Sequence, residues 1–139
     1  MLIDSKGIAL ACAVAACGAA MAWLRVSARS VDELVAHRPD WALWAVQLDG
    51  WADALGAARL DACAEVWPAD ALVYASAWLS PDRLDACAAA CPREALRYAS
   101  ALLTPICLDA CAEARPLAAL ECAAARLTPA RLAWCQAQS

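Results

Sequence analysis

A six-residue phrase recurs along the chain at a fixed interval and constrains the fold more than any other feature. It first reads Arg59-Leu60-Asp61-Ala62-Cys63-Ala64 and restarts, with changes, at positions 83, 107 and 131. The offsets 83 − 59, 107 − 83 and 131 − 107 give a period of 24 residues each time. A fixed period of about 20–50 residues is typical of stacked architectures, in which each unit packs only on its neighbours in sequence.

Each unit carries two signals for the start of a helix. The first is a hydroxyl residue followed by proline, at Ser80-Pro81, Thr104-Pro105 and Thr128-Pro129. The hydroxyl suits the N-cap, and proline loses no hydrogen bond at the first helical position. The second signal is a proline about eleven residues later, as at Pro92, which ends one helix and opens the next. We expect two helices of about 9–11 residues per unit, too short to be stable alone.

These signals predict an all-α protein, a short α-solenoid of about four helical-hairpin repeats with an N-terminal capping helix region. The repeat domain spans residues 31–139, with repeats near 31–58, 60–83, 84–107 and 108–131 and a C-terminal cap at 132–139. In the cap, Gln136 stands where the earlier units have alanine, so that the last unit presents a polar outer face.

The first repeat is degenerate and longer than the others. Val31-Asp32 followed by Pro39 aligns with Leu84-Asp85 followed by Pro92. The distance from Pro39 to the next such proline, at 68, is 29 residues rather than 24. The excess includes glycines at 50 and 56, which predict a longer turn or a kinked helix.

Residues 1–30 are an apolar segment with three interpretations. The uncharged run from Ile8 to Leu24 has 17 residues, of which eight are alanine, whereas a membrane span requires about 20 apolar residues. A signal peptide also fits poorly, because Asp4 offsets the charge of Lys6. We therefore favour a capping helix or helical hairpin over a membrane anchor or a cleaved signal.

Charge and cysteine usage narrow the class of protein. The net charge of −4 and the pI near 4.8 argue against nucleic-acid binding, which requires a basic face. Nine cysteines, an odd number, in an alanine-rich helical chain favour reduced thiols over a disulfide framework. We expect a cytoplasmic protein; the alternative is an inner-membrane protein anchored through Ile8–Leu24.

The pattern Thr104-Pro105, Leu108, Cys111-Ala112, Pro116, Ala119, Thr128-Pro129 resembles the leucine-rich repeat variant. That family has 24-residue, Thr-Pro-punctuated repeats that pair an α-helix with a second short helix, often 3₁₀. The likeness covers roughly residues 30–135, with cysteine and alanine where the family favours leucine and valine. It implies a right-handed helical stack without catalytic residues. Cys12 and Cys17 do not reproduce the N-terminal cysteine cluster that binds an iron–sulfur centre in some members, so no cofactor is implied.

Four cysteines raise the hypothesis of a metal site, namely Cys87, Cys91, Cys107 and Cys111. Two Cys-x₃-Cys pairs are able to ligate zinc or an iron–sulfur cluster. In a stack, however, Cys87 and Cys111 occupy equivalent positions on neighbouring helices. Cys91 lies one turn, about 5.4 Å, toward the C-terminus of its helix, and Cys107 lies one turn toward the N-terminus of its own, so the four thiols do not converge. We therefore expect no metal and interpret these cysteines as small buried hydrophobic residues. His37 is the only histidine and lacks a triad-like context, so we expect no enzyme.

Positions that vary between units indicate where a partner binds, because solenoids recognise ligands through extended surfaces. Tryptophan and arginine are also enriched at binding hot spots. The candidate protein-binding residues are Trp67, Trp78, Arg97, Arg115, Glu121 and Arg126. The sequence thus favours a non-enzymatic helical-repeat protein that binds another protein, as a small adaptor or inhibitor. A membrane-anchored helical module and a cysteine-ligated metal or redox protein are the alternatives.

Overall fold

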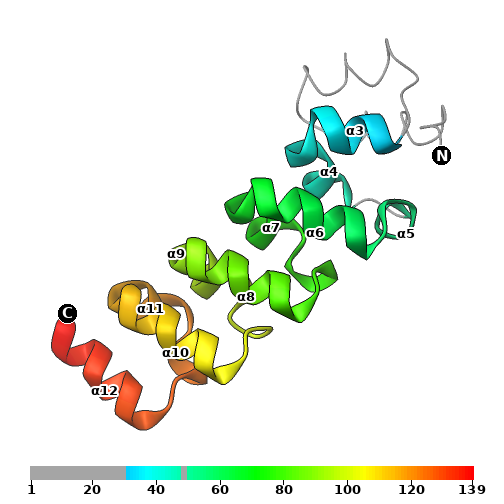
Figure 1. The fold of residues 1–139 in the computed structure, drawn as a ribbon. Coiled ribbons are helices and arrows are strands. Elements are labelled where there is room, and N and C mark those ends of the chain that lie inside the picture. The colour runs from blue at the N-terminus through cyan, green and yellow to red at the C-terminus, as the bar shows by residue number, and fades with distance from the viewer. Residues whose placement is uncertain (1–30, 48–49) are drawn as a thin grey trace.

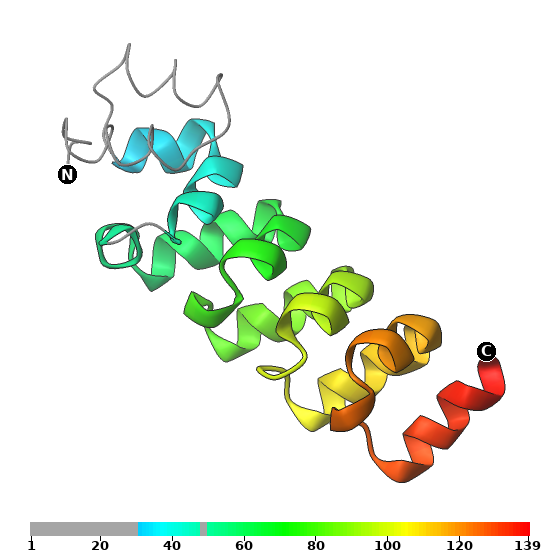
Figure 2. The same cartoon turned by 180° about the vertical axis from the view of Figure 1, so that it is seen from behind.

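The structure, a computed structural model, describes residues 31–47 and 50–139, and all regular elements in these ranges are helical. The all-α prediction is confirmed for this part of the chain. The helices form two layers along an elongated molecule, with α3 at one end and α12 at the other (Figures 1 and 2). The run Ile8–Leu24, with its three interpretations, lies outside the described residues.

One layer contains the helix that opens each unit, and we call it the first-helix layer. It faces the viewer in Figure 1. Successive members α6, α8, α10 and α12 contact one another, and each is ten residues long. The layer consists of α3 (Val31–His37), α6 (Ala57–Val66), α8 (Pro81–Ala90), α10 (Pro105–Ala114) and α12 (Pro129–Gln138).

The second-helix layer lies behind and faces the viewer in Figure 2. Its α-helices have at most seven residues, shorter than expected, because the chain leaves the α conformation early and continues as a 3₁₀ or π-helical turn. The layer consists of α4 (Pro39–Ala45), α7 (Pro68–Tyr74) with the 3₁₀ turn η1 (Ser76–Trp78), α9 (Pro92–Glu94) with the π-helical turn η2 (Ala95–Ala99), and α11 (Pro116–Cys122) with the 3₁₀ turn η3 (Ala124–Arg126).

The corner between the two layers has the same backbone geometry four times. Each corner residue has φ between −127° and −138° and ψ between 67° and 71°, and each precedes a proline. Proline disfavours helical angles in the residue before it, so the chain turns there. The degenerate first unit makes this turn at Arg38, as its alignment with the later units predicts. The corner residues are Arg38, Trp67, Cys91 and Arg115.

The predicted N-caps are also present. The hydroxyl oxygens of Ser80, Thr104 and Thr128 accept hydrogen bonds of 3.2–3.3 Å from backbone N–H groups three residues later. The extra residues of the first unit form α5 (Trp51–Leu55), between Gly50 and Gly56. Both glycines have φ near +80°, a conformation that side chains disfavour, which explains why glycine flanks this insertion.

Buried cysteine and alanine form the contact between successive first helices. The thiol of Cys87 lies 3.7 Å from the carbonyl oxygen of Ala64, at hydrogen-bonding distance for sulfur. Cys111 and Cys135 make the same contact, at 3.7 and 3.9 Å, with carbonyls 23 residues earlier. The alanines at 64, 88 and 112 are fully buried. The helices therefore approach closely enough that a small side chain is required on one side.

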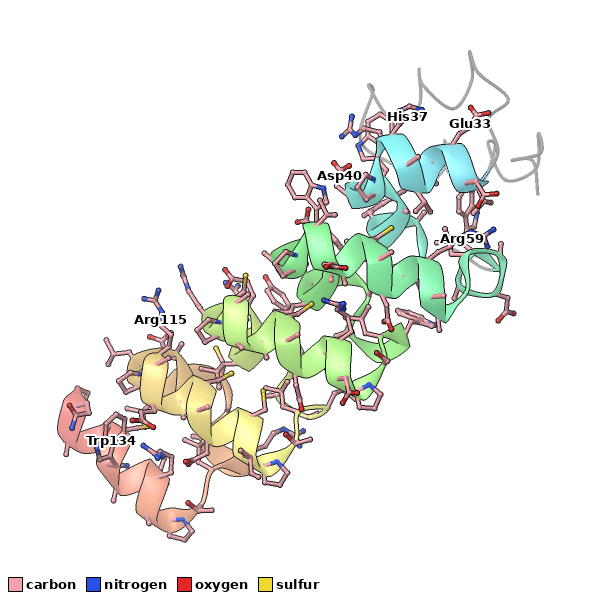
Figure 3. All side chains as sticks on the ribbon, viewed as in Figure 1. Glu33, His37, Asp40, Arg59, Arg115 and Trp134 are labelled. Atoms are coloured by element: carbon pink, nitrogen blue, oxygen red, sulfur yellow. The ribbon has the colours of Figure 1, made fainter. Side chains whose placement is uncertain are left out.

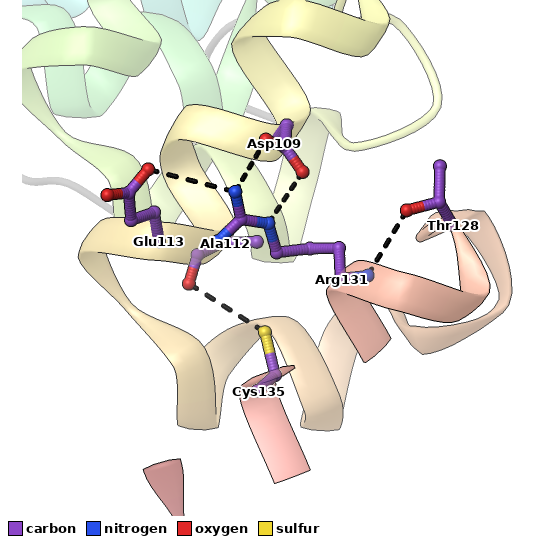
Figure 4. A network of polar contacts seen from close by, with 6 residues as sticks. All are labelled: Asp109, Ala112, Glu113, Thr128, Arg131 and Cys135. Atoms are coloured by element: carbon purple, nitrogen blue, oxygen red, sulfur yellow. Dashed lines mark hydrogen bonds and ion pairs between the residues drawn. The ribbon is translucent and has the colours of Figure 1, made fainter. Parts of the chain in front are cut away.

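Arginine adds an ionic contact at three of the junctions between first helices, α3–α6, α6–α8 and α10–α12. In Figure 4, Arg131 of α12 donates two hydrogen bonds, of 2.6 and 2.7 Å, to Asp109 of α10 and also reaches Glu113 at 3.8 Å. This guanidinium lowers the pKa of Asp109 through its hydrogen bonds. Arg59 pairs with Asp32 at 2.8 Å, which is 27 rather than 22 residues away. The five additional residues are those of the longer first unit.

We expect enlargement of the buried alanine column to destabilise the fold. Ala88→Leu should lower the free energy of unfolding by about 1–3 kcal/mol, because a close-packed interface has no room for the extra methyl groups. Gln136→Leu tests the equivalent position on the exposed outer side of α12 and should change stability by less than about 0.5 kcal/mol. Urea denaturation followed by circular dichroism measures both; equal effects would contradict the close packing.

Candidate protein-binding surface

Three of the four cysteines of the metal hypothesis contact backbone carbonyls, and the fourth lies at a corner. Cys87 and Cys111 are buried and donate to the preceding first helix, as described above. The Cys107 thiol lies 3.9 Å from the carbonyl oxygen of Asp85, and Cys91 is half-buried at a corner. Residues 31–47 and 50–139 contain no group of three or more His, Cys, Asp or Glu side chains arranged to hold a metal ion. The metal alternative therefore gains no support from the geometry.

The thiols of these four cysteines and of Cys63 are held in their neutral form. Burial raises the pKa of Cys63 to about 11. Burial, and after it the neighbouring Cys111 and Asp85, raises the pKa of Cys107 to about 12. Burial likewise raises the pKa of Cys87, Cys91 and Cys111. Since the thiolate is the nucleophile and the metal ligand, thiols with raised pKa values favour a packing role.

Cys107 marks a junction that differs from its neighbours. It occupies the position of Arg83 and Arg131 in the adjacent units. Those arginines reach Glu65 and Glu113 of the preceding unit, at 3.6 and 3.8 Å. The position equivalent to these glutamates at the α8–α10 junction is Ala89. The arginine and its acidic partner are thus replaced together, and a thiol contact takes the place of an ion pair.

All six candidate protein-binding residues are exposed, but they lie at three levels of the second-helix layer. Trp67 and Arg115 are at corners, before a second helix begins; Figure 3 shows Arg115 extending outward there. Arg97 and Glu121 lie on the second helices, in η2 and α11. Trp78 and Arg126 lie beyond them, in the 3₁₀ turns η1 and η3. The structure therefore places the candidates along one layer without gathering them at one point.

Large apolar side chains accompany these residues on the second-helix layer. Trp78 is 41% exposed, Tyr98 46% and Leu102 48%. The turn η1 contacts η2, and η2 contacts α11, so the residues come from adjacent elements. We call this surface the second-helix face and define it by Trp78, Arg97, Tyr98, Leu102, Glu121 and Arg126.

Sequence reasoning missed Tyr98. Tyr74 occupies the same position in the preceding unit, so this tyrosine reads as part of the structural repeat. In the structure Tyr74 is half-buried, whereas Tyr98 is exposed and its ring lies 5.4 Å from the Arg97 guanidinium carbon. This distance is within the range of a cation–π contact. The change to cysteine at 122, in the following unit, was the signal that the position varies.

Except for Arg38, which pairs with Asp40 at 2.7 Å, the arginines of the described chain divide by layer. Arg59, Arg83 and Arg131, in the first-helix layer, each pair with an acidic residue of the preceding unit. Arg93, Arg97, Arg115 and Arg126 follow the first helices of the last two complete units, and all four are exposed. Within the described ranges, no ion pair joins any of these four to an acidic residue. Their charges are therefore available to a ligand.

Arg126 lies at the edge of the second-helix face. It lines an open groove of about 590 Å³ with Ile106 and Leu127, between the start of α10 and η3. The remaining arginines, at 93, 97 and 115, come from α9, η2 and the corner before α11, which are contiguous elements.

As for a membrane, no helix in residues 31–47 or 50–139 has the length and apolar character to cross one.

The buried thiols predict a loss of stability at alkaline pH. Cys63 has a folded-state pKa of about 11 against an ordinary value of 9.0, so the unfolded state releases its proton first as pH rises. Its contribution is complete below pH 9 and declines toward pH 11, by about 1.4 kcal/mol per pH unit for one proton. Cys63→Ala should therefore unfold with a weaker dependence on pH between 9 and 11. The free energy of unfolding, measured by urea titration at several pH values, gives this dependence. The same dependence on pH in the wild type and in Cys63→Ala would contradict the raised pKa of Cys63.

No protein-family model matches the chain, and no curated protein or solved structure matches it significantly. Function is therefore inferred from the residues and geometry of this chain alone.

Proposed function

We propose that this chain is a non-enzymatic α-solenoid of about four helical-hairpin repeats, of the leucine-rich repeat variant type, that binds another protein through its second-helix face. It acts as a small adaptor or inhibitor. The observation that carries this proposal is a division between positions. The apolar residues that recur in every unit, such as the cysteines at 63, 87, 111 and 135, are buried, whereas the six candidate residues occupy positions that change from unit to unit and are exposed along the second-helix layer.

Contacts at constant sequence separation support the solenoid. The thiol–carbonyl contacts join residues 23 apart at three successive junctions. The Arg131–Asp109 pair spans 22 residues, and the Arg59–Asp32 pair spans 22 plus the five of the longer first unit. Equal separations are expected when each unit packs on the preceding one in the same way.

Exposed aromatic and aliphatic side chains support protein binding. Trp78, Tyr98 and Leu102 each leave more than two fifths of their surface in water, although most large apolar residues of the described chain are buried or half-buried. Such side chains, rimmed by charged residues, are typical of protein-interaction surfaces. The exposed His37 and the neutral buried thiols offer no activated group, which supports the non-enzymatic part of the proposal.

The solenoid predicts that one whole unit is removable. Deletion of residues 84–107 joins Arg83 to Leu108 and keeps the register of the first helix. Cys111 then lies where Cys87 was, facing the carbonyl of Ala64. We expect a folded, shorter protein with the same helicity per residue and a cooperative unfolding transition, because nearest-neighbour contacts carry the stability. Deletion of 84–95, half a unit, is the control and should unfold the protein. Loss of cooperative unfolding in the whole-unit deletion as well would contradict the solenoid.

The binding surface predicts that two apolar truncations on the second-helix face remove the partner. Tyr98→Ala combined with Leu102→Ala should abolish capture of the specific partner from the native cell, because apolar anchors carry most binding energy. Val66→Ala, the control, removes an exposed side chain, at 64%, from the first-helix layer and should leave capture unchanged. Circular dichroism checks that both variants keep their helices. A partner retained by the double variant and lost by the control would assign binding to the other layer.

A further inference from the structure

We propose that the second-helix face, together with Arg93 and Arg115 beside it, binds an acidic protein segment with aromatic or aliphatic side chains, and that Arg93, Arg97 and Arg115 receive its carboxylates. This inference rests on the proposed function and names the chemical class of the partner. It follows from the separation of charge between the two layers, from the pairing of the arginines, and from the apolar side chains beside them.

The two layers carry opposite net charge in the central part of the molecule. The first helices α8 and α10 contain four acidic residues and one arginine, a net charge of 1 − 4 = −3. The segments that follow them, residues 91–104 and 115–128, contain four arginines and two glutamates, a net charge of 4 − 2 = +2. The second-helix layer of these two units is therefore a cationic surface on a chain whose net charge is −4.

The arginines of these two segments make no ion pair with an acidic residue of the described chain, in contrast to Arg59, Arg83 and Arg131 of the first-helix layer. Arg93, Arg97 and Arg115 are exposed, and their neighbours Glu94 and Glu121 make no ion pair with them. A guanidinium binds a carboxylate through two parallel hydrogen bonds, as Arg131 binds Asp109 within this chain. The three guanidinium groups are therefore suited to carboxylates supplied by a partner.

Apolar side chains lie beside these charges. The Arg97 guanidinium lies over the ring of Tyr98, which restrains it before any ligand binds. Leu102 and Leu117 are about half exposed, and Leu117 occupies in its unit the position that Arg93 occupies in the preceding one. Both arginine and tyrosine here come from the π-helical turn η2, and π-helical turns are frequent at functional sites. The surface thus combines charged and apolar contacts, as protein interfaces do.

A polyanion such as nucleic acid or an anionic membrane fits this surface less well than a protein segment. Such ligands require many phosphate contacts, whereas this patch offers three arginines and contains two glutamates. The acidic first-helix layer also repels an extended polyanion. A folded or extended segment with a few separated carboxylates avoids both costs.

The test lets the surface select its own ligands. A random-peptide display library is selected on the immobilised full-length chain, and the affinities of enriched peptides are measured by fluorescence polarisation. We expect acidic peptides with aromatic or aliphatic residues. Arg93→Gln, Arg97→Gln and Arg115→Gln together should weaken them about tenfold or more. The matched control, Ala62→Glu, Ala86→Glu and Ala110→Glu, changes the net charge equally on exposed positions of the first helices and should weaken them by less than about threefold.

The other outcomes overturn the inference in distinguishable ways. Enrichment of neutral or basic peptides, or equal weakening by the two variants, rules out recognition by these arginines. Peptides lost with Tyr98→Ala and Leu102→Ala, but kept with the glutamine variant, overturn the acidic partner and leave the proposed function intact. Selection of no peptide sensitive to either change overturns both. If phosphatidylserine vesicles or single-stranded DNA bind more tightly than the selected peptides, through the same arginines, the surface is assigned to a polyanion instead.

Discussion

Close approach of successive first helices is the constraint on which the structure depends. A fully buried alanine on one helix lies beneath a cysteine of the next, and the thiol donates to that alanine's carbonyl. A helical carbonyl has a second lone pair that is free to accept such a weak donor. Larger side chains would separate the helices and lose this contact. The short distance between the first helices therefore explains why alanine and cysteine occupy these positions. This packing is required, because helices of about ten residues or fewer are not stable alone.

The ionic contacts show how far the units depart from identity. Arg59 and Arg131 reach the aspartate that the alignment pairs with them, whereas Arg83 reaches Glu65 and leaves Asp61 to accept from the backbone N–H of Ser80. At the α8–α10 junction Cys107 replaces the arginine, and Asp85 accepts from the hydroxyl of Thr104. Exposed ion pairs contribute only about 0–1 kcal/mol each. The buried alanine and cysteine, rather than the ion pairs, are thus the common element of the three junctions from α6 to α12.

The two helix layers differ in how far packing constrains their residues. The arginines of the first-helix layer form ion pairs between units, so their positive charges are paired within the chain. The second-helix layer contributes alanine and leucine to the core through one side and leaves the other side unconstrained. Tyr98, Leu102 and the arginines occupy that side. A surface that stability does not constrain is free to acquire the residues that a partner requires, which is the physical basis for the proposed binding function.

The sequence by itself determined the helical class, the prolines at which helices begin and the buried cysteine column. Proline and hydroxyl residues act locally, through fixed φ angles and N-cap hydrogen bonds, so their effects at Ser80 or Pro92 are readable without coordinates. The period placed Cys63, Cys87, Cys111 and Cys135 at equivalent positions, and all four are buried.

Only the tertiary structure decided which residues share a surface and which charges are paired. Tyr74 and Tyr98 are identical in the sequence pattern, yet one is half-buried and the other exposed. Arg83 and Arg93 look alike in the sequence, but one pairs with Glu65 and the other faces water. Such differences depend on neighbours from other units, about 20 residues away in the chain, and on the lengths at which the second helices end. Local patterns do not contain that information.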